Sequence, residues 1–315
     1  MLEVRNLSVV YPDGTPALQN LSISLGVQEV LGIIGESGSG KSTLALAIMR
    51  LLPPDADVKG EILYNGKDVL GLSKSELERV RGTEIAMIFQ DALSAFDPLM
   101  RVGPQIIEKA VTKKVLGYKK ARVRAVDLMR GLGVTNPEAR FDAYPHELSG
   151  GLRQRAFIAM GLFQKPKIII LDEPTSALDV ITQAQLIQTI RGLKEGGLSM
   201  IFITHDIALA STICDRVAVL YAGKMMEYGS VDQVIRRPIH PYTQGLIEST
   251  PTLSSVRRGL KVMKGYLPNL KSLPSGCRFH PRCPFATGIC RSVEPEPIKQ
   301  SDGRLVACHM AADSK

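Results

Sequence analysis

Short apolar runs, each bounded by glycine, proline or charged residues, predict the buried strands of this chain. Runs of this length indicate strands, because a helix usually needs ten or more residues. The predicted strands of this kind cover residues 30–34, 84–89, 168–173, 199–204, 215–220 and 224–228. Residues 2–9 and 18–25 instead alternate between apolar and polar positions on either side of a turn at 11–14. This alternation predicts an antiparallel sheet at the start of the chain.

The stretch from about residue 91 to residue 165 has a different pattern, because helical periodicity replaces the apolar strands. Helices are expected over residues 102–115, 119–132 and 150–163. Since strands precede and follow this stretch, we expect a helical subdomain inserted between strands of the core.

Residues 35–42, which Thr43 follows, match a phosphate-binding loop at every fixed position of the motif G-x-x-x-x-G-K-[ST]. Glycines let the backbone aim several N–H groups at one point, and the helix that follows, 44–52, offers its N-terminal dipole to an anion. Lys41 adds a cation for the β- and γ-phosphates, and Ser42 adds a hydroxyl for Mg²⁺. The residues of the loop expected to bind nucleotide are Gly35, Ser37, Gly38, Ser39, Gly40, Lys41, Ser42 and Thr43. The expected fold class is α/β, with a P-loop nucleotide-binding core, an antiparallel β subdomain and the helical insertion.

Polar side chains follow three of the predicted strands, at the edge where doubly wound sheets place ligand groups. Asp172 is expected to hold Mg²⁺, and Glu173 to polarise a water molecule for attack on the γ-phosphate. Gln90 can reach the Mg²⁺ and that water, and His205 can donate to a γ-phosphate oxygen. A purely structural role is the alternative for Gln90 and His205, each taken alone.

Two further features have both a functional and a structural interpretation. Leu148-Ser149-Gly150-Gly151 begins a helix, and is either a second anion-binding helix start or a plain N-cap. Tyr11 precedes the phosphate loop by 24 residues, and either stacks on a nucleotide base or ends a strand.

Composition adds limits on the class of protein. The chain has 315 residues, 44% of them apolar, and a formal net charge of +8. This surplus of positive charge suits nucleotide phosphates, a membrane surface or nucleic acid, or reflects a mildly basic soluble surface. No apolar run reaches the roughly 18 residues that span a bilayer, and the N-terminus does not resemble a signal peptide. We therefore expect a cytoplasmic protein with no membrane span of its own.

Taken together, the order of these motifs resembles the ATP-binding subunit of an ATP-binding cassette (ABC) transporter, over about residues 1–250. The resemblance implies that Tyr11 stacks on adenine, Glu173 is the general base and His205 is the switch histidine. It also implies a homo- or heterodimer, in which Ser149 and Gly151 contact the ATP held by the other subunit. The nucleotide-binding residues that it implies outside the loop are Tyr11, Gln90, Ser149, Gly150, Gly151, Asp172 and Asp179.

Two segments are similar to the oligopeptide/dipeptide/nickel importer subfamily: residues 89–98 and His240-Pro241-Tyr242-Thr243. This similarity implies ATP-driven import of di- or oligopeptides through two separate membrane subunits, with an extracytoplasmic binding protein as an indirect partner. The chain would then lie peripherally on the cytoplasmic face of the membrane, with no nucleic-acid partner. Nickel or sugar import is the alternative within this class, and a soluble cassette ATPase acting on nucleic acid or ribosomes is the alternative outside it.

The last part of the chain, residues 251–315, is expected to form a small cysteine-rich extension. Cys277, Cys283, Cys290 and Cys308 are separated by 5, 6 and 17 residues in a loop-rich region. Four thiolates around one point suit a [4Fe–4S] cluster or tetrahedral Zn²⁺, for which His280 and His309 are further candidate ligands. Spacing alone ranks these two metals equally, with a metal-free tail as the third alternative. The subfamily resemblance favours the [4Fe–4S] cluster.

Overall fold

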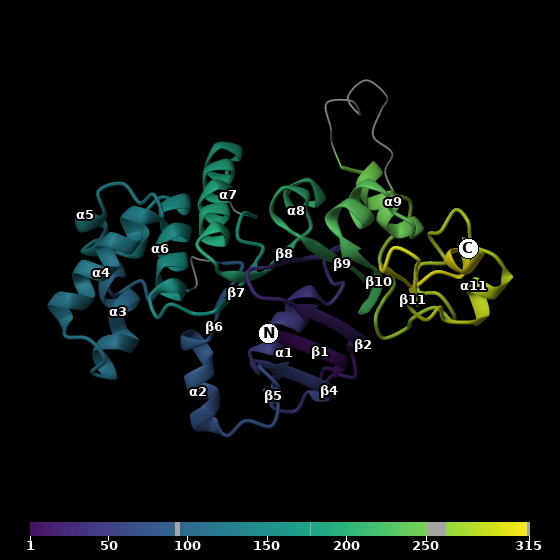
Figure 1. Ribbon diagram of the computed structural model, residues 1–315, viewed down its shortest axis with the longest axis horizontal. Coiled ribbons are helices and arrows are strands. Elements are labelled where there is room, and N and C mark those ends of the chain that lie inside the picture. Colours follow the sequence, from purple (N-terminus) through teal and green to yellow (C-terminus); the bar gives the residue numbers. More distant parts are fainter. Residues whose placement is uncertain (92–94, 177, 251–262, 314–315) are drawn as a thin grey trace. The chain divides into compact units, whose positions relative to one another are not determined.

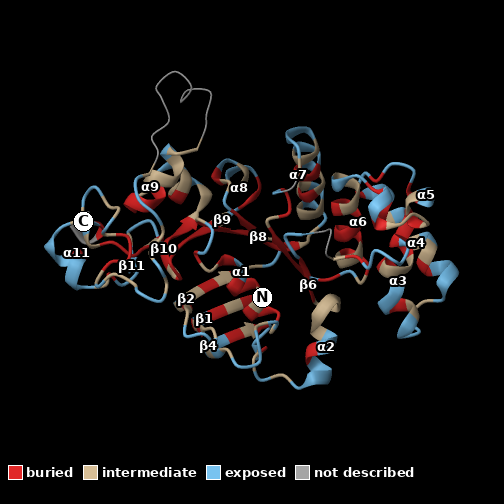
Figure 2. Ribbon diagram, turned by 180° about the vertical axis from the view of Figure 1, so that it is seen from behind, coloured by how far each residue is buried: buried red, intermediate tan, exposed pale blue. Residues whose placement is uncertain are grey.

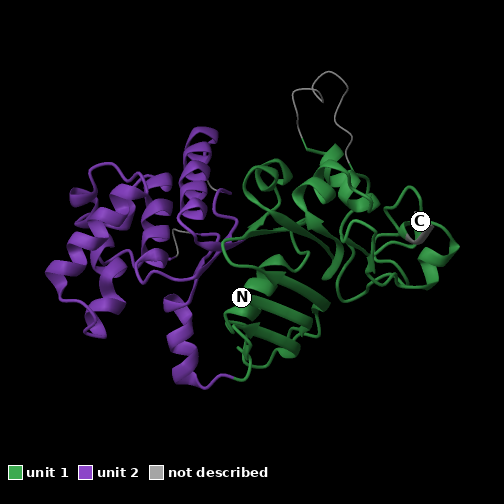
Figure 3. Ribbon diagram, in the orientation of Figure 1, with its two compact units in different colours: residues 1–71, 202–315 green, residues 72–201 purple. Residues whose placement is uncertain are grey.

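A computed structural model of the chain describes residues 1–91, 95–176, 178–250 and 263–313. Two predictions fall partly outside these residues: the subfamily segment 89–98 at 92–94, and the cysteine-rich extension predicted after residue 250 at 251–262 and 314–315. The chain forms two compact units, which Figure 3 colours separately. Unit 1 contains residues 1–71 and 202–315, and unit 2 contains residues 72–201.

Unit 1 begins with an antiparallel sheet in the order β2-β1-β4-β5. Its strands are β1 (Leu2–Val10), β2 (Pro16–Leu25), β4 (Asp57–Tyr64) and β5 (Lys67–Asp68). Leu2 pairs with Leu25 on one side and with Tyr64 on the other. The alternation along β1 buries Leu2 and Val4 on one face, and the predicted antiparallel start is confirmed.

The phosphate loop follows one strand of a second set in unit 1, of which β9 (Arg216–Tyr221) and β10 (Lys224–Ser230) are labelled in Figure 1. β3 (Val30–Ile34) pairs in parallel with β9, and every residue of β3 is buried. β9 then pairs antiparallel with β10. The helix α1 (Lys41–Ile48) begins within the loop motif, at Lys41, three residues earlier than the apolar pattern alone predicts. The loop is thus held between a buried strand and a helix N-terminus.

The C-terminal segment, by which we mean residues 263–313, belongs to unit 1. Its strand β12 (Leu305–Val306) pairs with β10, and β11 (Ile298–Lys299) pairs with β12. These two-residue strands are too short to leave a periodic pattern, so sequence analysis missed them. The remaining helical elements of unit 1 are α8 (Ile207–Ile213), α9 (Pro241–Glu248), α11 (Gly288–Ser292) and the turns Asp232–Arg236 and His309–Asp313.

Unit 2 contains the helical subdomain and two parallel strands, β6 (Ile85–Ile88) and β7 (Ile168–Asp172). Its helices are α2 (Lys74–Thr83), α3 (Val102–Thr112), α4 (Tyr118–Gly131), α5 (Pro137–Phe141), α6 (Gly150–Leu162) and α7 (Val180–Glu195), with a short turn at Pro145–Glu147. The helices α3 and α5 approach closely, because a Cβ atom on Gly103 would lie 2.2 Å from the ring of Phe141. β8 (Ser199–Thr204) begins in unit 2 and ends in unit 1.

Burial follows the strands in both units, as the red ribbons of Figure 2 show. β3, β6, β7 and β8 are buried at every position, which explains their unbroken apolar runs. Among the described residues, no helix is both long and apolar enough to cross a bilayer.

Candidate active site

The phosphate loop turns where only glycine fits. Gly35 has a φ of +157°, and a Cβ atom there would lie 2.2 Å from the carbonyl oxygen of Leu220 on β9. Gly40, the N-cap of α1, has a φ of +103°, and its Cβ would lie 2.6 Å from the oxygen of Ala17. The loop therefore packs directly on the backbone of its neighbours, which is what a glycine-rich motif permits.

Lys41 lies inside the loop rather than in solvent. Its Nζ atom donates to the carbonyl oxygens of Gly35 and Glu36, both at 2.9 Å, and the residue is 5% exposed. The backbone N–H of Ser39 also donates to the oxygen of Glu36, at 3.2 Å. The ammonium group is thus held at the centre of the loop by weak, exchangeable partners. A phosphate oxygen, which is a charged acceptor, binds an ammonium more strongly than a carbonyl does.

Tyr11 lies next to the phosphate loop, since its hydroxyl is 3.2 Å from the Oγ1 atom of Thr43. The turn that follows Tyr11 is also tied to the C-terminal segment, because Lys271 Nζ lies 2.9 Å from an Asp13 carboxylate oxygen. The hydrogen bond from Lys271 lowers the pKa of Asp13 to about 2. Both residues of this ion pair are largely exposed, so it orients the turn more than it stabilises the fold.

Gln90 and Glu173 meet in unit 2, at one edge of the β6–β7 pair. Because Ile88 pairs with Leu171 in parallel register, the residues that follow both strands emerge side by side. The Nε2 atom of Gln90 donates to a Glu173 carboxylate oxygen at 3.3 Å. Glu173 has a φ of +46°, in the left-handed region that a residue with a side chain rarely adopts. This conformation turns the chain at Glu173, directly after the end of β7.

Asp172 and His205 are the other two candidate site residues that were predicted at the ends of strands. Asp172 is the last residue of β7 and is 5% exposed, so its carboxylate lies below the surface next to Glu173. His205 follows β8 in unit 1 and is exposed. The next residue, Asp206, caps α8 by accepting from the N–H of Leu209 at 3.0 Å. This cap fixes where the chain turns after His205.

Ser149 and Asp179 begin two neighbouring helices of unit 2. Ser149 caps α6 by accepting from the N–H of Leu152 at 3.4 Å, and Asp179 caps α7 by accepting from the N–H of Thr182 at 2.9 Å. The hydroxyl hydrogen bond from Thr182 lowers the pKa of Asp179. A Cβ atom on Gly151 would lie 2.3 Å from the Cγ2 of Thr182, so the two helix starts are in contact. The structure therefore gathers Ser149, Gly151 and Asp179 at one place.

The four cysteines of the C-terminal segment line one small cavity, here called the cysteine cavity, together with His240, His280, His309 and several apolar side chains. The predicted [4Fe–4S] cluster is nevertheless wrong, and so is its Zn²⁺ alternative. All four cysteines lie in the described part of the chain, and within that part no three His, Cys, Asp or Glu side chains are arranged to hold a metal ion. Burial raises the pKa of Cys277 to about 11, and also raises the pKa of Cys283 and of Cys308.

Sequence analysis missed two residues that hold the loop. The Arg282 guanidinium forms two hydrogen bonds with the Glu36 carboxylate, at 2.9 and 3.0 Å. The hydroxyl of Tyr242 accepts from the backbone N–H of Glu36 at 3.0 Å. Glu36 occupies a variable position of the motif and its partners lie more than 200 residues away, so no local signal points to them.

Comparison with known proteins identifies the class. The family model for the ABC transporter matches residues 18–176. The structure is also similar to MJ0796, a bacterial ABC transporter cassette solved as a dimer, with a TM-score of 0.66 and 28% identity over 73% of this chain and 99% of that one. A second structure of that cassette, with the same TM-score of 0.66, contains ADP and Pi. The chain belongs to the ABC transporter family and is an ATPase of that type.

Within that family the chain is similar to ATP-binding subunits of peptide transporters. The family model for the oligopeptide/dipeptide transporter C-terminal region matches residues 226–290. The oligopeptide transport ATP-binding protein OppD of Escherichia coli (strain K12) is 43% identical over 98% of this chain and 92% of its own length. The dipeptide transport ATP-binding protein DppD of Haemophilus influenzae is 42% identical over 98% of this chain and 95% of its own length.

Proposed function

We infer that this chain hydrolyses ATP to drive the import of di- or oligopeptides through separate membrane subunits. Near full-length identity of 43% to an oligopeptide transport ATP-binding protein is the observation that carries this inference. The loop and strand-end groups described above support it chemically, because they supply phosphate-binding donors and a carboxylate held by an amide.

The phosphate loop and Tyr11 would bind ATP. Lys41 would exchange its two carbonyl partners for β- and γ-phosphate oxygens, and the loop N–H groups would supply further donors. The Tyr11 ring would stack on adenine, and its contact with Thr43 supports this role, because it links the ring to the helix that starts at the phosphates.

Mg²⁺ fits the donors that this chain offers. Ser42, Gln90 and Asp172 present hydroxyl, amide and carboxylate oxygens, which are the hard ligands that Mg²⁺ prefers. When bound, Mg²⁺ would neutralise charge on the phosphates. The small exposed fraction of Asp172, 5%, supports a role in which its carboxylate faces a ligand rather than bulk water.

Glu173 would act as general base on the attacking water. The hydrogen bond that Gln90 donates orients the Glu173 carboxylate. The left-handed backbone of Glu173 turns the chain away from the direction of β7. His205 would contact the γ-phosphate from the end of β8. Ser149, Gly150, Gly151 and Asp179 would contact the nucleotide of a second ATP-binding subunit, and the MJ0796 cassette dimer supports such an arrangement.

The implied assembly has two ATP-binding subunits and two membrane permease subunits, with a substrate-binding protein outside the membrane. Peptides are the proposed cargo, because the relatives are named as oligopeptide and dipeptide transport proteins. The chain would lie peripherally at the cytoplasmic face of the membrane. We propose that residues 1–250 form the nucleotide-binding domain and that the cysteine-rich part after it is a metal-free extension.

The substitution Glu173→Gln tests this function. We expect ATP hydrolysis to fall by a factor of about 100 or more, because an amide cannot accept the proton, while ATP binding is retained. The ATP-bound dimer should accumulate, which gel filtration with ATP can measure. Turnover close to that of the wild type would rule out Glu173 as the base. The matched control is Glu195→Gln, which removes a carboxylate from the last turn of α7 and should leave turnover unchanged.

A further inference from the structure

Glu36 places a negative charge inside a loop that binds an anion. It is the second residue of the phosphate loop, and its side chain is 29% exposed, so solvent screens it only in part. A carboxylate carried by a phosphate-binding loop disfavours a bound anion unless a cation compensates it. The loop therefore needs a partner for Glu36 that Lys41, committed to the phosphates, does not supply.

Arg282 of the C-terminal segment supplies that partner. Its two terminal nitrogens bind both oxygens of the Glu36 carboxylate, in the bidentate geometry of the stronger ion pairs. The side chain of Arg282 is 6% exposed. Two further contacts hold Arg282 in place. Its Nε atom donates to the carbonyl oxygen of Lys264 at 3.1 Å, and its guanidinium lies 5.7 Å from the ring centre of Tyr221.

Every polar group of Glu36 has a partner in the structure. Its N–H donates to the Tyr242 hydroxyl, its carbonyl accepts from Lys41 and Ser39, and its carboxylate accepts from Arg282. Tyr242 belongs to a buried aromatic cluster, in which its ring lies 4.6 Å from that of Tyr221 and 5.3 Å from that of Phe279. The start of the loop is thus anchored to α9, β9 and the C-terminal segment together.

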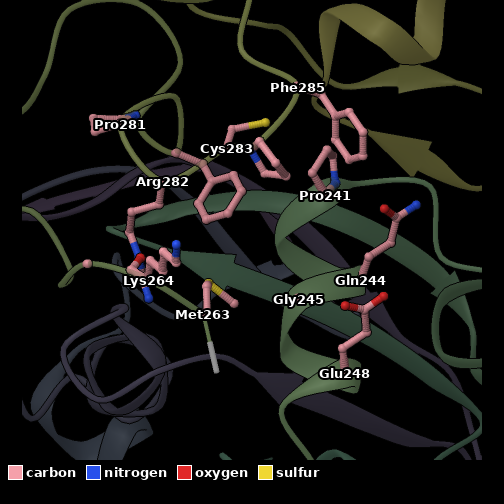
Figure 4. A pocket seen from close by; sticks show the side chains of 13 residues that line it. Pro241, Gln244, Gly245, Glu248, Met263, Lys264, Pro281, Arg282, Cys283 and Phe285 are labelled. Atoms are coloured by element: carbon pink, nitrogen blue, oxygen red, sulfur yellow. The ribbon is translucent and has the colours of Figure 1, made fainter. Parts of the chain in front are cut away.

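The C-terminal segment reaches the loop at a second point and the neighbouring turn at a third. A Cβ atom on Gly38 would lie 3.3 Å from the Cδ2 of Leu267, so the segment runs against the middle of the loop. Lys271 then pairs with Asp13 in the turn after Tyr11. Figure 4 shows the region around Arg282 and Lys264, which line one side of a cavity of about 700 Å³ whose other side is α9.

We propose that Arg282 is a positioning residue of the ATP site, which neutralises Glu36 and holds the phosphate loop in its binding conformation. The C-terminal segment is then a working part of the nucleotide site and not only an appendage to it. This inference rests on the proposed role of the phosphate loop. It adds a specific electrostatic task to residues that the loop motif does not contain.

The test measures KM and kcat for MgATP with the full chain and its membrane partners. Arg282→Ala should raise KM about tenfold, the size expected for losing a charge-assisted hydrogen bond, and change kcat less than about twofold. The increase in KM should be smaller at about 1 M salt than at about 0.1 M salt, because the Debye length falls from about 10 Å to about 3 Å. The matched control is Arg236→Ala, which breaks an exposed pair with Asp232 and should leave KM unchanged.

A double variant distinguishes an electrostatic role of Arg282 from a packing role. In the double variant Glu36→Gln with Arg282→Ala, the uncompensated carboxylate is gone, so KM should return to within about threefold of the wild type. An unchanged KM in Arg282→Ala, or a loss that Glu36→Gln does not restore, would overturn the proposal. If Arg282→Ala does not fold, Arg282→Lys keeps the charge but loses the bidentate geometry, and should give an intermediate KM.

Lys41→Ala is measured alongside and separates this inference from the proposed function. Unchanged ATP binding in Lys41→Ala would overturn the assignment of the phosphate loop itself. Lost binding in Lys41→Ala together with a wild-type KM in Arg282→Ala would overturn only the role of Arg282.

Discussion

The phosphate loop and the cysteine cavity both gather ligand-type groups, but in the described part of the chain no three such side chains of the cavity are arranged to hold a metal ion. In the loop, Lys41 is buried but bonded to two carbonyl oxygens that a phosphate can replace. In the cavity, Cys277 and Cys308 are buried, and burial raises the pKa of both thiols. Both sites were predicted from the spacing of residues in the sequence. The two differ in that the loop motif also places glycines where the backbone needs them, whereas the spacing of the cysteines does not specify a backbone conformation.

The largest expected effect comes from breaking the geometry of the loop. Gly35→Ala should reduce stability by about 3 kcal/mol or abolish folding, because its Cβ atom would lie 2.2 Å from the Leu220 oxygen, and neither backbone can yield easily. ATP binding should be lost with it. Chemical denaturation and nucleotide titration measure the two effects.

The control for that substitution is Gly14→Ala. Gly14 also has a positive φ, +82°, but a Cβ atom there meets nothing within 4 Å. Gly14→Ala should lower the free energy of unfolding by only about 1 kcal/mol, which is the cost of placing a residue with a side chain in the left-handed conformation. Equal losses in the two variants would show that backbone conformation, and not the contact with β9, makes Gly35 necessary.

A smaller effect on stability is expected from the protonation of His240, which lines the cysteine cavity and caps α9. Its Nδ1 atom accepts from the N–H of Tyr242 at 2.9 Å, and burial lowers the pKa of the imidazole to about 3. The unfolded chain therefore binds a proton below about pH 6.5 that the folded chain rejects. Stability should fall as the pH drops from about 6.5 toward 3, by up to about 1.4 kcal/mol per pH unit for this one group.

His240→Asn sharpens that prediction, since asparagine caps a helix but does not titrate. The difference in unfolding free energy between the wild type and this variant should change with pH in that window. Glu227 also borders His240, and burial raises the pKa of its carboxyl, which has the opposite pH dependence. Taking the difference between the two proteins removes this contribution. A difference that does not vary with pH would show that His240 is not held neutral.

The smallest expected effect is on the reactivity of the thiols. Alkylation of the native protein near pH 7 should be slow, because the thiolate is the reactive form and burial raises the pKa of Cys277 and Cys283. Cys283, which is less buried than Cys277, Cys290 and Cys308, should react first. Mass spectrometry after timed labelling measures the order. Rapid labelling of Cys277 at neutral pH would contradict a protonated, buried thiol.

Much of the candidate site follows from local patterns. A glycine-rich loop after a buried strand specifies its own conformation, and parallel strands with matched ends bring their next residues together. The contact between Gln90 and Glu173 follows from the matched parallel register of β6 and β7. The two-residue strands β11 and β12 and the helix α9 escaped prediction, because their form depends on pairing and packing with distant segments.

The sequence by itself determined where the phosphate-binding loop lies, where its flanking strand and helix run, and which family the motifs resemble, because each of these depends on residues close together in the chain. Only the tertiary structure decided that Glu36 is compensated by Arg282, 246 residues later, and that Cys277 and Cys308 are buried, which raises the pKa of both thiols. Ion pairing and protonation depend on which charges and apolar groups surround a side chain. Those surroundings are assembled from segments that are distant in sequence, so no local pattern records them.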